Sequence, residues 1–266
     1  MTADILAAMN AAPKPLSQQQ PLVSIAMPAY NAEETLAEAV ASVRSQTYPH
    51  WELLIVDDGS SDQTLAIAKA QASQDERIRV IALTSPSGGP AIPRNHAMAE
   101  SSGRYQAFLD ADDQWLPEKL ATQVAAMERE GWAISCTAYR TFGNQTGCFV
   151  PPDKAGHSDL LSENTAGCLT VMFDRSLFAD ARFPVCGHED YALWLSLTSK
   201  GHEIRGISQP LARYCVRAGS VSSSAWRVLG FFWRIYRDQE KLGVATSFFY
   251  CLRYAWNTRN KYRRAL

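Results

Sequence analysis

Short apolar runs alternate with amphipathic segments along residues 22–109. The apolar runs have the length of strands, and the segments between them repeat apolar residues at helical spacing. The predicted strands are 22–27, 51–56, 78–83 and 105–109, and the predicted helices are 33–46, about 62–72 and about 91–101. This alternation predicts an α/β fold with a mostly parallel central sheet and helices on both faces.

The order of elements becomes less regular after residue 115. The expected elements are a helix at 117–129, strands near 133–139 and 167–173 around a polar loop at 151–166, a helix from about 190, and strands near 203–207 and 211–217. Residues 226–266 are helical and amphipathic. We therefore expect a flexible leader at 1–20, an α/β domain at 21–221 and a helical tail at 222–266.

Carboxylates directly follow two of the predicted strands. Asp57 and Asp58 come after the second strand, and Asp110, Asp112 and Asp113 come after the fourth. In open α/β sheets, ligands bind beyond the carboxyl ends of the strands. One crevice is therefore expected to collect these side chains.

The three carboxylates of Asp110, Asp112 and Asp113 lie within four residues. They repel one another unless a cation neutralises them. Carboxylate oxygens together with substrate phosphates are ligands that suit Mg²⁺ or Mn²⁺. The alternative is a turn, because Asp is common in turns and at helix starts.

Asp58 and Arg94 each have a candidate binding role. Asp58 ends a strand, where a carboxylate can accept hydrogen bonds from a base or a ribose. Arg94 opens a helix after a Gly-rich loop and could pair with a phosphate. A solvated arginine at a helix end is the alternative for Arg94.

Two acids, Glu189 and Asp190, stand at the start of a predicted helix. Capping explains acids at this position, because the helix dipole favours them. A carboxylate here could also act as a general base toward a hydroxyl. We expect the dipole to keep Asp190 ionised, which suits a base.

Composition narrows the class of protein. The chain has 266 residues, 46% of them hydrophobic, and a net charge of −1, so it is neither disordered nor low in complexity. Its six cysteines form no CxxC pair, which excludes a zinc ribbon and favours free thiols in a cytoplasmic protein. No apolar stretch approaches the roughly 20 residues that span a bilayer.

The charge is divided unevenly along the chain. Residues 226–266 hold nine Lys and Arg against two acids, a net of +7, whereas residues 1–225 carry −8. The tail also holds 11 of the 27 aromatic residues. It is predicted to lie on an anionic membrane surface, and the alternatives are packing on the body or on a second subunit as a homodimer. Nucleic acid is disfavoured as a partner because the predicted crevice is acidic.

Five segments together resemble the family 2 inverting glycosyltransferases of GT-A fold. They are VSIAMPAYN, WELLIVDDGSSD, PRN, SGRYQAFLDADDQWLPEKL and GHEDYALWLSL, in this order, over about residues 22–220. The resemblance implies a GT-A domain with a nucleotide-binding part at 21–115 and an acceptor-binding part at 116–221.

The resemblance also implies roles for single residues. The residues implied to bind the nucleotide sugar are Pro28, Ala29, Tyr30, Glu33, Asp58, Arg94, Asp110 and Asp112. Asp110 and Asp112 match the DxD motif, which meets the ribose and a divalent metal, Mn²⁺ or Mg²⁺, with Asp113 beside them as a further metal ligand. Asp190 matches the catalytic base, and Glu189 precedes it in the ED pair.

The implied activity is that of a hexosyl- or N-acetylhexosaminyltransferase. It would move one sugar, with inversion, from a nucleotide sugar such as a UDP-sugar to a glycan or lipid-linked glycan acceptor. We expect this reaction in bacterial surface polysaccharide or lipopolysaccharide synthesis, at the inner face of the cytoplasmic membrane. Residues 209–214 lack the QxxRW motif of processive members, which indicates single additions. A nucleotidyltransferase of related fold and a non-catalytic, membrane-associated sugar-nucleotide-binding protein are the alternatives.

Overall fold

The computed structural model describes residues 20–216 and 225–264, and the expected leader lies almost wholly outside this range. Its elements are β1 (Val23–Ala29), α2 (Leu36–Arg44), β2 (Trp51–Asp57), α3 (Thr64–Ala72), β3 (Ile78–Ala82), α4 (Ala91–Glu100), β4 (Tyr105–Phe108), β5 (Gln114–Trp115), α5 (Lys119–Glu130), β6 (Ile134–Gly143), β7 (Gly147–Phe149), β8 (Lys154–Ala155), α6 (His157–Leu160), the 3₁₀ turn η1 (Cys168–Thr170), β9 (Met172–Asp174), α7 (Glu189–Thr198), β10 (Ile204–Val216), α8 (Ala225–Arg234), the π-helical η3 (Ile235–Gln239) and α9 (Val244–Arg264).

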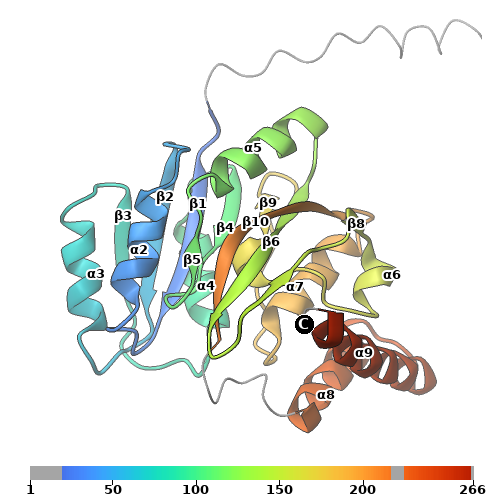
Figure 1. Cartoon of the computed structure of the whole chain (residues 1–266). Helices are drawn as coiled ribbons and strands as arrows, with labels where there is room; N and C mark the ends of the chain where they lie inside the picture. Colours follow the sequence, from blue (N-terminus) through green and yellow to red (C-terminus); the bar gives the residue numbers. More distant parts are fainter. Residues whose placement is uncertain (1–19, 217–224, 265–266) are drawn as a thin grey trace, which may run out of the picture.

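One twisted sheet forms the centre of the molecule (Figure 1). Its strand order is β3-β2-β1-β4-β9-β6-β10-β5, and β7 and β8 pair at its margins. The first four strands in this order are parallel, β9 runs antiparallel between β4 and β6, and β10 is again parallel to β6. The predicted mostly parallel sheet is therefore confirmed.

Buried side chains cover the sheet on both faces. Ile25 and Leu53 belong to a cluster with residues of α2, α3 and α5. Their neighbours Ala26 and Leu54 belong to a second cluster with residues of α4 and α7. Successive strand residues point to opposite faces, so a strand buried on both sides appears in the sequence as a continuous apolar run. The predicted helices on both faces are confirmed.

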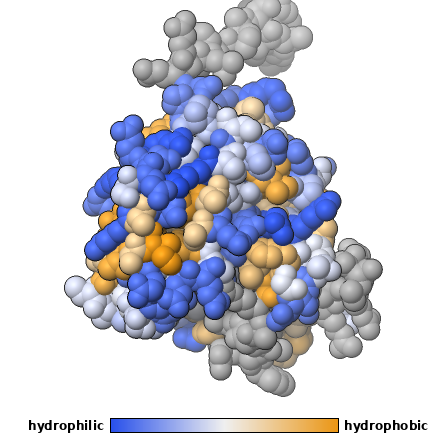
Figure 2. Space-filling view, turned by 60° about the vertical axis from the view of Figure 1, so that its left-hand side comes forward, coloured by the Kyte–Doolittle hydropathy of each residue, from blue (hydrophilic) through white to orange (hydrophobic). Residues whose placement is uncertain are grey.

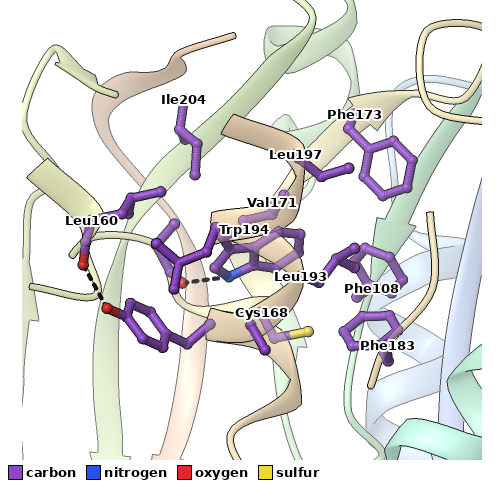
Figure 3. Close-up of a cluster of buried hydrophobic side chains, with 14 of the residues drawn as sticks. Phe108, Leu160, Cys168, Val171, Phe173, Phe183, Leu193, Trp194, Leu197 and Ile204 are labelled. Atoms are coloured by element: carbon purple, nitrogen blue, oxygen red, sulfur yellow. Dashed lines mark hydrogen bonds between the residues drawn. The ribbon is translucent and has the colours of Figure 1, made fainter. Parts of the chain in front are cut away.

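The second cluster fixes α7 beside the sheet (Figure 3). Trp194 of α7 is fully buried, and its indole N–H donates to the Ala166 carbonyl at 3.2 Å. Phe108 at the end of β4 packs near Trp194, with ring centroids 6.1 Å apart, and edge-on against Phe183 at 5.0 Å. This packing holds the first turn of α7 close to the carboxyl end of β4.

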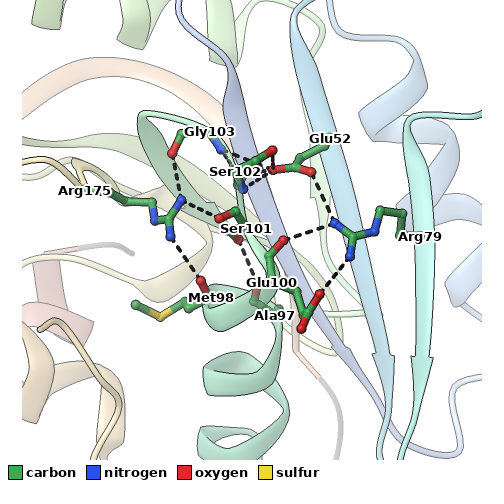
Figure 4. Close-up of polar contacts among 10 residues, drawn as sticks. Glu52, Arg79, Ala97, Met98, Glu100, Ser101, Ser102, Gly103 and Arg175 are labelled. Atoms are coloured by element: carbon green, nitrogen blue, oxygen red, sulfur yellow. Dashed lines mark hydrogen bonds and ion pairs between the residues drawn. The ribbon is translucent and has the colours of Figure 1, made fainter. Parts of the chain in front are cut away.

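Polar contacts fasten the opposite edge of the sheet, at the amino ends of β1 and β2 (Figure 4). The Glu52 carboxylate accepts hydrogen bonds from the backbone N–H of Ser102 at 2.6 Å and of Gly103 at 3.2 Å. Arg175 donates to the carbonyls of Ser101 and Gly103 at 2.8 and 2.9 Å. The turn between α4 and β4 is thereby fixed to the amino end of the sheet.

Two expected strand boundaries are wrong. The segment 167–173 is extended only from Met172, because the Thr170 N–H and hydroxyl both bond to the Gly167 carbonyl and close a turn. The strands expected near 203–207 and 211–217 are one strand, β10, whose pairing with β6 slips between Ile207 and Pro210. The loop expected at 151–166 contains β8 and α6.

The helical tail packs on the body beside α6 and α7 (Figure 1). Phe232 and Tyr236 are buried, and the Tyr236 hydroxyl donates to the Leu161 carbonyl at 2.8 Å. The Gln239 amide donates to the Ala192 carbonyl in α7 at 2.7 Å. Packing on the body, the alternative for the tail, is therefore confirmed.

Two further expectations concern thiols and membrane crossing. All six cysteines are free, as expected. In the part of the chain that the structure describes, no helix combines the length and the apolar character needed to cross a bilayer.

Candidate active site

Two cavities meet at the carboxyl edge of the sheet. The first has a volume of 530 Å³ and lies beyond β1, β2 and β4. Its lining includes Pro28, Ala29, Tyr30, Asp58 and Asp112. These five expected donor-site residues, which come from three segments distant in sequence, are therefore brought together. They meet because parallel strands end at the same edge.

The second cavity has a volume of 970 Å³ and lies beside the first turn of α7. Arg94, Glu189 and Asp190 line it, together with Asp113. The two cavities share the loop residues 88–90 and Asp110. A molecule held in the first cavity would thus reach the second past Asp110.

Asp58 is positioned by the loop that follows β3. Its carboxylate accepts hydrogen bonds from the Ser87 N–H at 3.0 Å and from the Ser87 hydroxyl at 2.8 Å. Gly59 beside it has a φ of +69°, and a Cβ there would lie 2.7 Å from the Ser85 carbonyl carbon. Glycine is required at this turn, and the turn brings the loop against the carboxylate.

Glu33 is not one of the residues that line the two cavities. Its carboxylate accepts a hydrogen bond from the Gln63 N–H at 2.9 Å, at the start of α3. In return, the Glu33 N–H donates to Asp62 at 3.2 Å. Its contact with the Gln63 N–H instead caps the start of α3.

Arg94 joins the two halves of the site. Its side chain is 4% exposed, so the solvated alternative is wrong. One guanidinium nitrogen lies 2.7 Å from Asp110 Oδ1 and the other lies 2.8 Å from Glu189 Oε1. Burial alone would lower the pKa of Arg94, but the adjacent Asp110 and Glu189 raise it above its usual range. Arg94 therefore stays charged and pairs two acids from distant segments.

Asp113 is 1% exposed and serves the fold at this edge. Its Oδ1 accepts a hydrogen bond from the Cys215 N–H in β10 at 2.8 Å. Burial, and then Asp110 and Asp112, raise the pKa of the Asp113 carboxyl well above its usual range. Among residues 20–216 and 225–264, no three His, Cys, Asp or Glu side chains are grouped as metal ligands.

Asp190 lines the second cavity at the start of α7. Its Oδ1 accepts a hydrogen bond from the Tyr191 N–H at 2.7 Å. Burial raises the pKa of the Asp190 carboxyl, Glu189 raises it further, and Arg94 opposes both. Burial has the largest effect on this pKa, and the contribution of the helix dipole stays a prediction. A raised pKa makes the ionised carboxylate a stronger base.

Aromatic residues that the sequence analysis did not assign complete the second cavity. They include Tyr139 of β6, Tyr214 of β10 and Phe231 of α8. The φ of Gly187 is +91°, and the Phe231 ring lies where a Cβ on Gly187 would be. These three aromatics come from segments far apart in the chain, so no local pattern could have identified them.

Comparison with known proteins shows the family of the chain. Residues 24–176 match the family model "Glycosyl transferase family 2". The chain is 37% identical over 92% of its length to TuaG of Bacillus subtilis, provisionally named a teichuronic acid biosynthesis glycosyltransferase, and spans 99% of that protein. It is 38% identical over 82% of its length to WfgD of Escherichia coli, named a UDP-Glc:alpha-D-GlcNAc-diphosphoundecaprenol beta-1,3-glucosyltransferase, and spans 86% of it.

Solved structures share the fold. The S. aureus TarS fragment 1–349 with UDP-GlcNAc matches with a TM-score of 0.69 at 22% identity, over 85% of this chain and 69% of that one. PcManGT from Pyrobaculum calidifontis, a mannosyltransferase in complex with GDP-Man and Mn²⁺, matches with a TM-score of 0.66 at 20% identity, over 88% and 68%. With a family model covering more than half of it and two relatives above 30% identity, the chain belongs to glycosyl transferase family 2 and is a glycosyltransferase of GT-A fold.

Proposed function

We propose that the protein transfers one sugar, with inversion, from a UDP-sugar to a hydroxyl of a lipid-linked glycan. The observation that carries this proposal is the meeting of two cavities at Asp110. Asp58 and Asp112 line one cavity, and Asp190 lines the other. The names of WfgD and WfaP, both at 38% identity, support a nucleotide-sugar donor and a lipid-diphosphate acceptor. The reaction would belong to bacterial surface polysaccharide or lipopolysaccharide synthesis, at the cytoplasmic face of the membrane.

The first cavity is proposed to hold the nucleotide. The Tyr30 side chain is 53% exposed at its wall, so the ring is available to pack on a base. Pro28 and Ala29 form the floor at the end of β1. Asp58, already fixed by Ser87, is placed to accept a hydrogen bond from the base or the ribose.

Asp112 and Asp110 are proposed to hold a divalent metal, Mn²⁺ or Mg²⁺, together with the donor diphosphate. Both residues line the first cavity, and one or two carboxylates plus substrate phosphates form a common site for these ions. The metal would supply positive charge to the leaving diphosphate. Asp113 fits this role poorly, because its carboxylate is buried and bonded to the Cys215 N–H. We assign it to positioning the turn.

Asp190 is proposed as the general base. The oxygen of the acceptor hydroxyl would form the new bond to the anomeric carbon while its proton passes to the Asp190 carboxylate. The bond from that carbon to the diphosphate would break, and the nucleoside diphosphate would leave from the opposite face. Arg94 holds Asp110 and Glu189 on either side of this reaction path.

The direct test is a panel of UDP- and GDP-sugars with Mn²⁺ and a synthetic GlcNAc-diphosphate-lipid acceptor. We expect one UDP-sugar to yield an acceptor extended by one sugar, with release of UDP. A parallel assay supplies UTP and a sugar 1-phosphate in place of the UDP-sugar, and release of pyrophosphate there would instead indicate the nucleotidyltransferase alternative. Donor binding without turnover on any acceptor would favour a binding protein and contradict the proposal.

A further inference from the structure

The outer side of α9 carries large apolar side chains that the fold does not cover. They are Val244, Phe248, Phe249, Leu252 and Trp256, each between 53% and 70% exposed. We propose that this outer α9 face binds the surface of an anionic lipid bilayer. This inference goes beyond the transfer reaction and does not depend on it.

The exposed side chains share one face of the helix. Val244, Phe248, Leu252 and Trp256 are four residues apart and form a single stripe, and Phe249, three residues before Leu252, widens it on the same side. The opposite face supplies the contacts to the body, where Ser247 and Cys251 are buried and Tyr254 stacks on Phe232 with ring centroids 3.7 Å apart. The outer face is thus left over after α9 has docked.

The stripe is unusual on this surface. In the part of the chain with described side chains, ten large hydrophobic residues are exposed, and five of these are the outer α9 face. A sixth, Trp233, lies on the neighbouring α8. By contrast, the face of the molecule in Figure 2 is mainly hydrophilic, with small separate apolar areas. A concentrated apolar stripe of this kind marks an interaction surface.

Positive charge accompanies the stripe. Arg253 is exposed on the same helix, and the last turns of α9 have in their sequence Arg259, Lys261, Arg263 and Arg264. Near it, the acid Glu240 is paired with His157 at 3.0 Å. Aromatic and aliphatic residues flanked by arginines and lysines are the composition of a helix that lies in the headgroup region of anionic lipids.

Charge also argues against a second copy of the chain as the partner. A two-fold interface would place the same patch of both subunits face to face. Each tail carries a net charge of +7, so their basic residues would repel one another in such a dimer. An anionic bilayer complements both the apolar and the basic components.

The helix that packs against α9 also lines the second cavity. Phe231 of α8 and the 75% exposed Val185 both line that cavity. The next residue, Phe232, stacks on Tyr254 of α9 with ring centroids 3.7 Å apart. A consequence follows that rests on the proposed lipid-linked acceptor. Its glycan part could reach the second cavity while its lipid part stays in the bilayer.

The test is flotation of the full chain with vesicles of phosphatidylcholine containing phosphatidylglycerol, and with phosphatidylcholine alone. No donor or acceptor is present, so failure here is distinguishable from failure of the proposed transfer. We expect binding to the anionic vesicles and a loss of about tenfold in the triple variant Phe248→Gln, Leu252→Gln, Trp256→Gln. The matched control changes two exposed apolar residues elsewhere, Val150→Gln and Leu177→Gln, and should float like the parent.

Three outcomes would overturn the proposal. The first is equal flotation of the parent and the triple variant, and the second is equal loss in the control variant. The third is a parent protein that does not float with the vesicles and that light scattering shows to be a dimer, while the triple variant is a monomer. All the substituted side chains are exposed, so the thermal unfolding midpoint of each variant should equal that of the parent. Equal midpoints exclude misfolding as the cause of a loss of flotation.

Discussion

The guanidinium of Arg94 lies 2.8 Å from the carboxylate of Glu189, although the two residues are 95 positions apart. The same guanidinium contacts Asp110 at 2.7 Å. A buried ion pair of this kind loses much when one partner is removed, because the other charge is left uncompensated. Arg94 therefore sets the position of the first turn of α7, and with it Asp190, relative to the end of β4.

Replacing Glu189 with Gln should move the pH dependence of transfer. Glu189 raises the pKa of Asp190, so its neutralisation lowers that pKa, and the base stays ionised to lower pH. We expect the acid limb of the pH–rate profile to shift downward. A Gln can still accept the Arg94 hydrogen bond, which limits structural change.

The matched control for this variant is Glu240→Gln. Glu240 of the tail pairs with His157 of α6 and is not among the groups that shift the pKa of Asp190, so the acid limb of Glu240→Gln should equal that of the parent. If Glu189 acted only by holding the structure, Glu189→Gln would lower the transfer rate at every pH without shifting the acid limb. That result would contradict the electrostatic role.

Asp112→Asn should weaken metal-dependent donor binding. An amide oxygen is a poorer ligand than a carboxylate for Mg²⁺ or Mn²⁺, so more metal is needed. We expect UDP titrations to require about tenfold more Mn²⁺ than for the parent. The exposed Asp180→Asn serves as the control and should behave as the parent. An unchanged Mn²⁺ requirement in Asp112→Asn would remove this residue from the metal site.

Gly59→Ala should disturb the Asp58 side of the first cavity. The added Cβ would lie 2.7 Å from the Ser85 carbonyl carbon, at a φ of +69°. We expect a loss of about 1–3 kcal/mol in the free energy of unfolding and weaker UDP binding. Gly131→Ala shares the positive φ of +68° but has nothing within 4 Å, so it isolates the backbone cost. If both variants bind UDP like the parent, the loop does not position Asp58.

Much of the donor side could be predicted from the sequence, because it depends on local signals. The strand ends at Ala29, Asp57 and Phe108 follow apolar runs, and parallel strands must end at one edge. The relation of Arg94 to Glu189 could not be predicted, since it depends on how α7 docks. The capping contact of Glu33 was also missed, because a cap and a ligand contact use the same residue type.

The tail illustrates a second limit. Its composition indicates amphipathic helices, but which apolar residues face the body depends on tertiary packing. Phe232 and Tyr236 are buried, whereas Phe248 and Leu252 are exposed, although all four are apolar or aromatic positions of the same tail. Periodicity alone does not distinguish these two faces.

The buried Lys119 should make stability depend on pH. Burial lowers the pKa of Lys119 to about 7, below the unfolded value, so between these values the unfolded chain binds more protons. The free energy of unfolding should therefore rise with pH, on the order of 1–2 kcal/mol from pH 7 to 8.5. Lys119→Met should abolish this rise in urea unfolding measured at both pH values. Parallel pH dependence in the two proteins would contradict the assignment.

The assignment of Asp190 as the base is tested most directly by Asp190→Asn. The measurement is the transfer rate with the preferred UDP-sugar, alongside UDP affinity in the presence of Mn²⁺. Because Asp190 lines the second cavity and does not line the first, donor binding should be unchanged. We predict that transfer falls by about 10²–10⁴-fold while UDP affinity stays within about twofold. Transfer at a near-normal rate in this variant would contradict it.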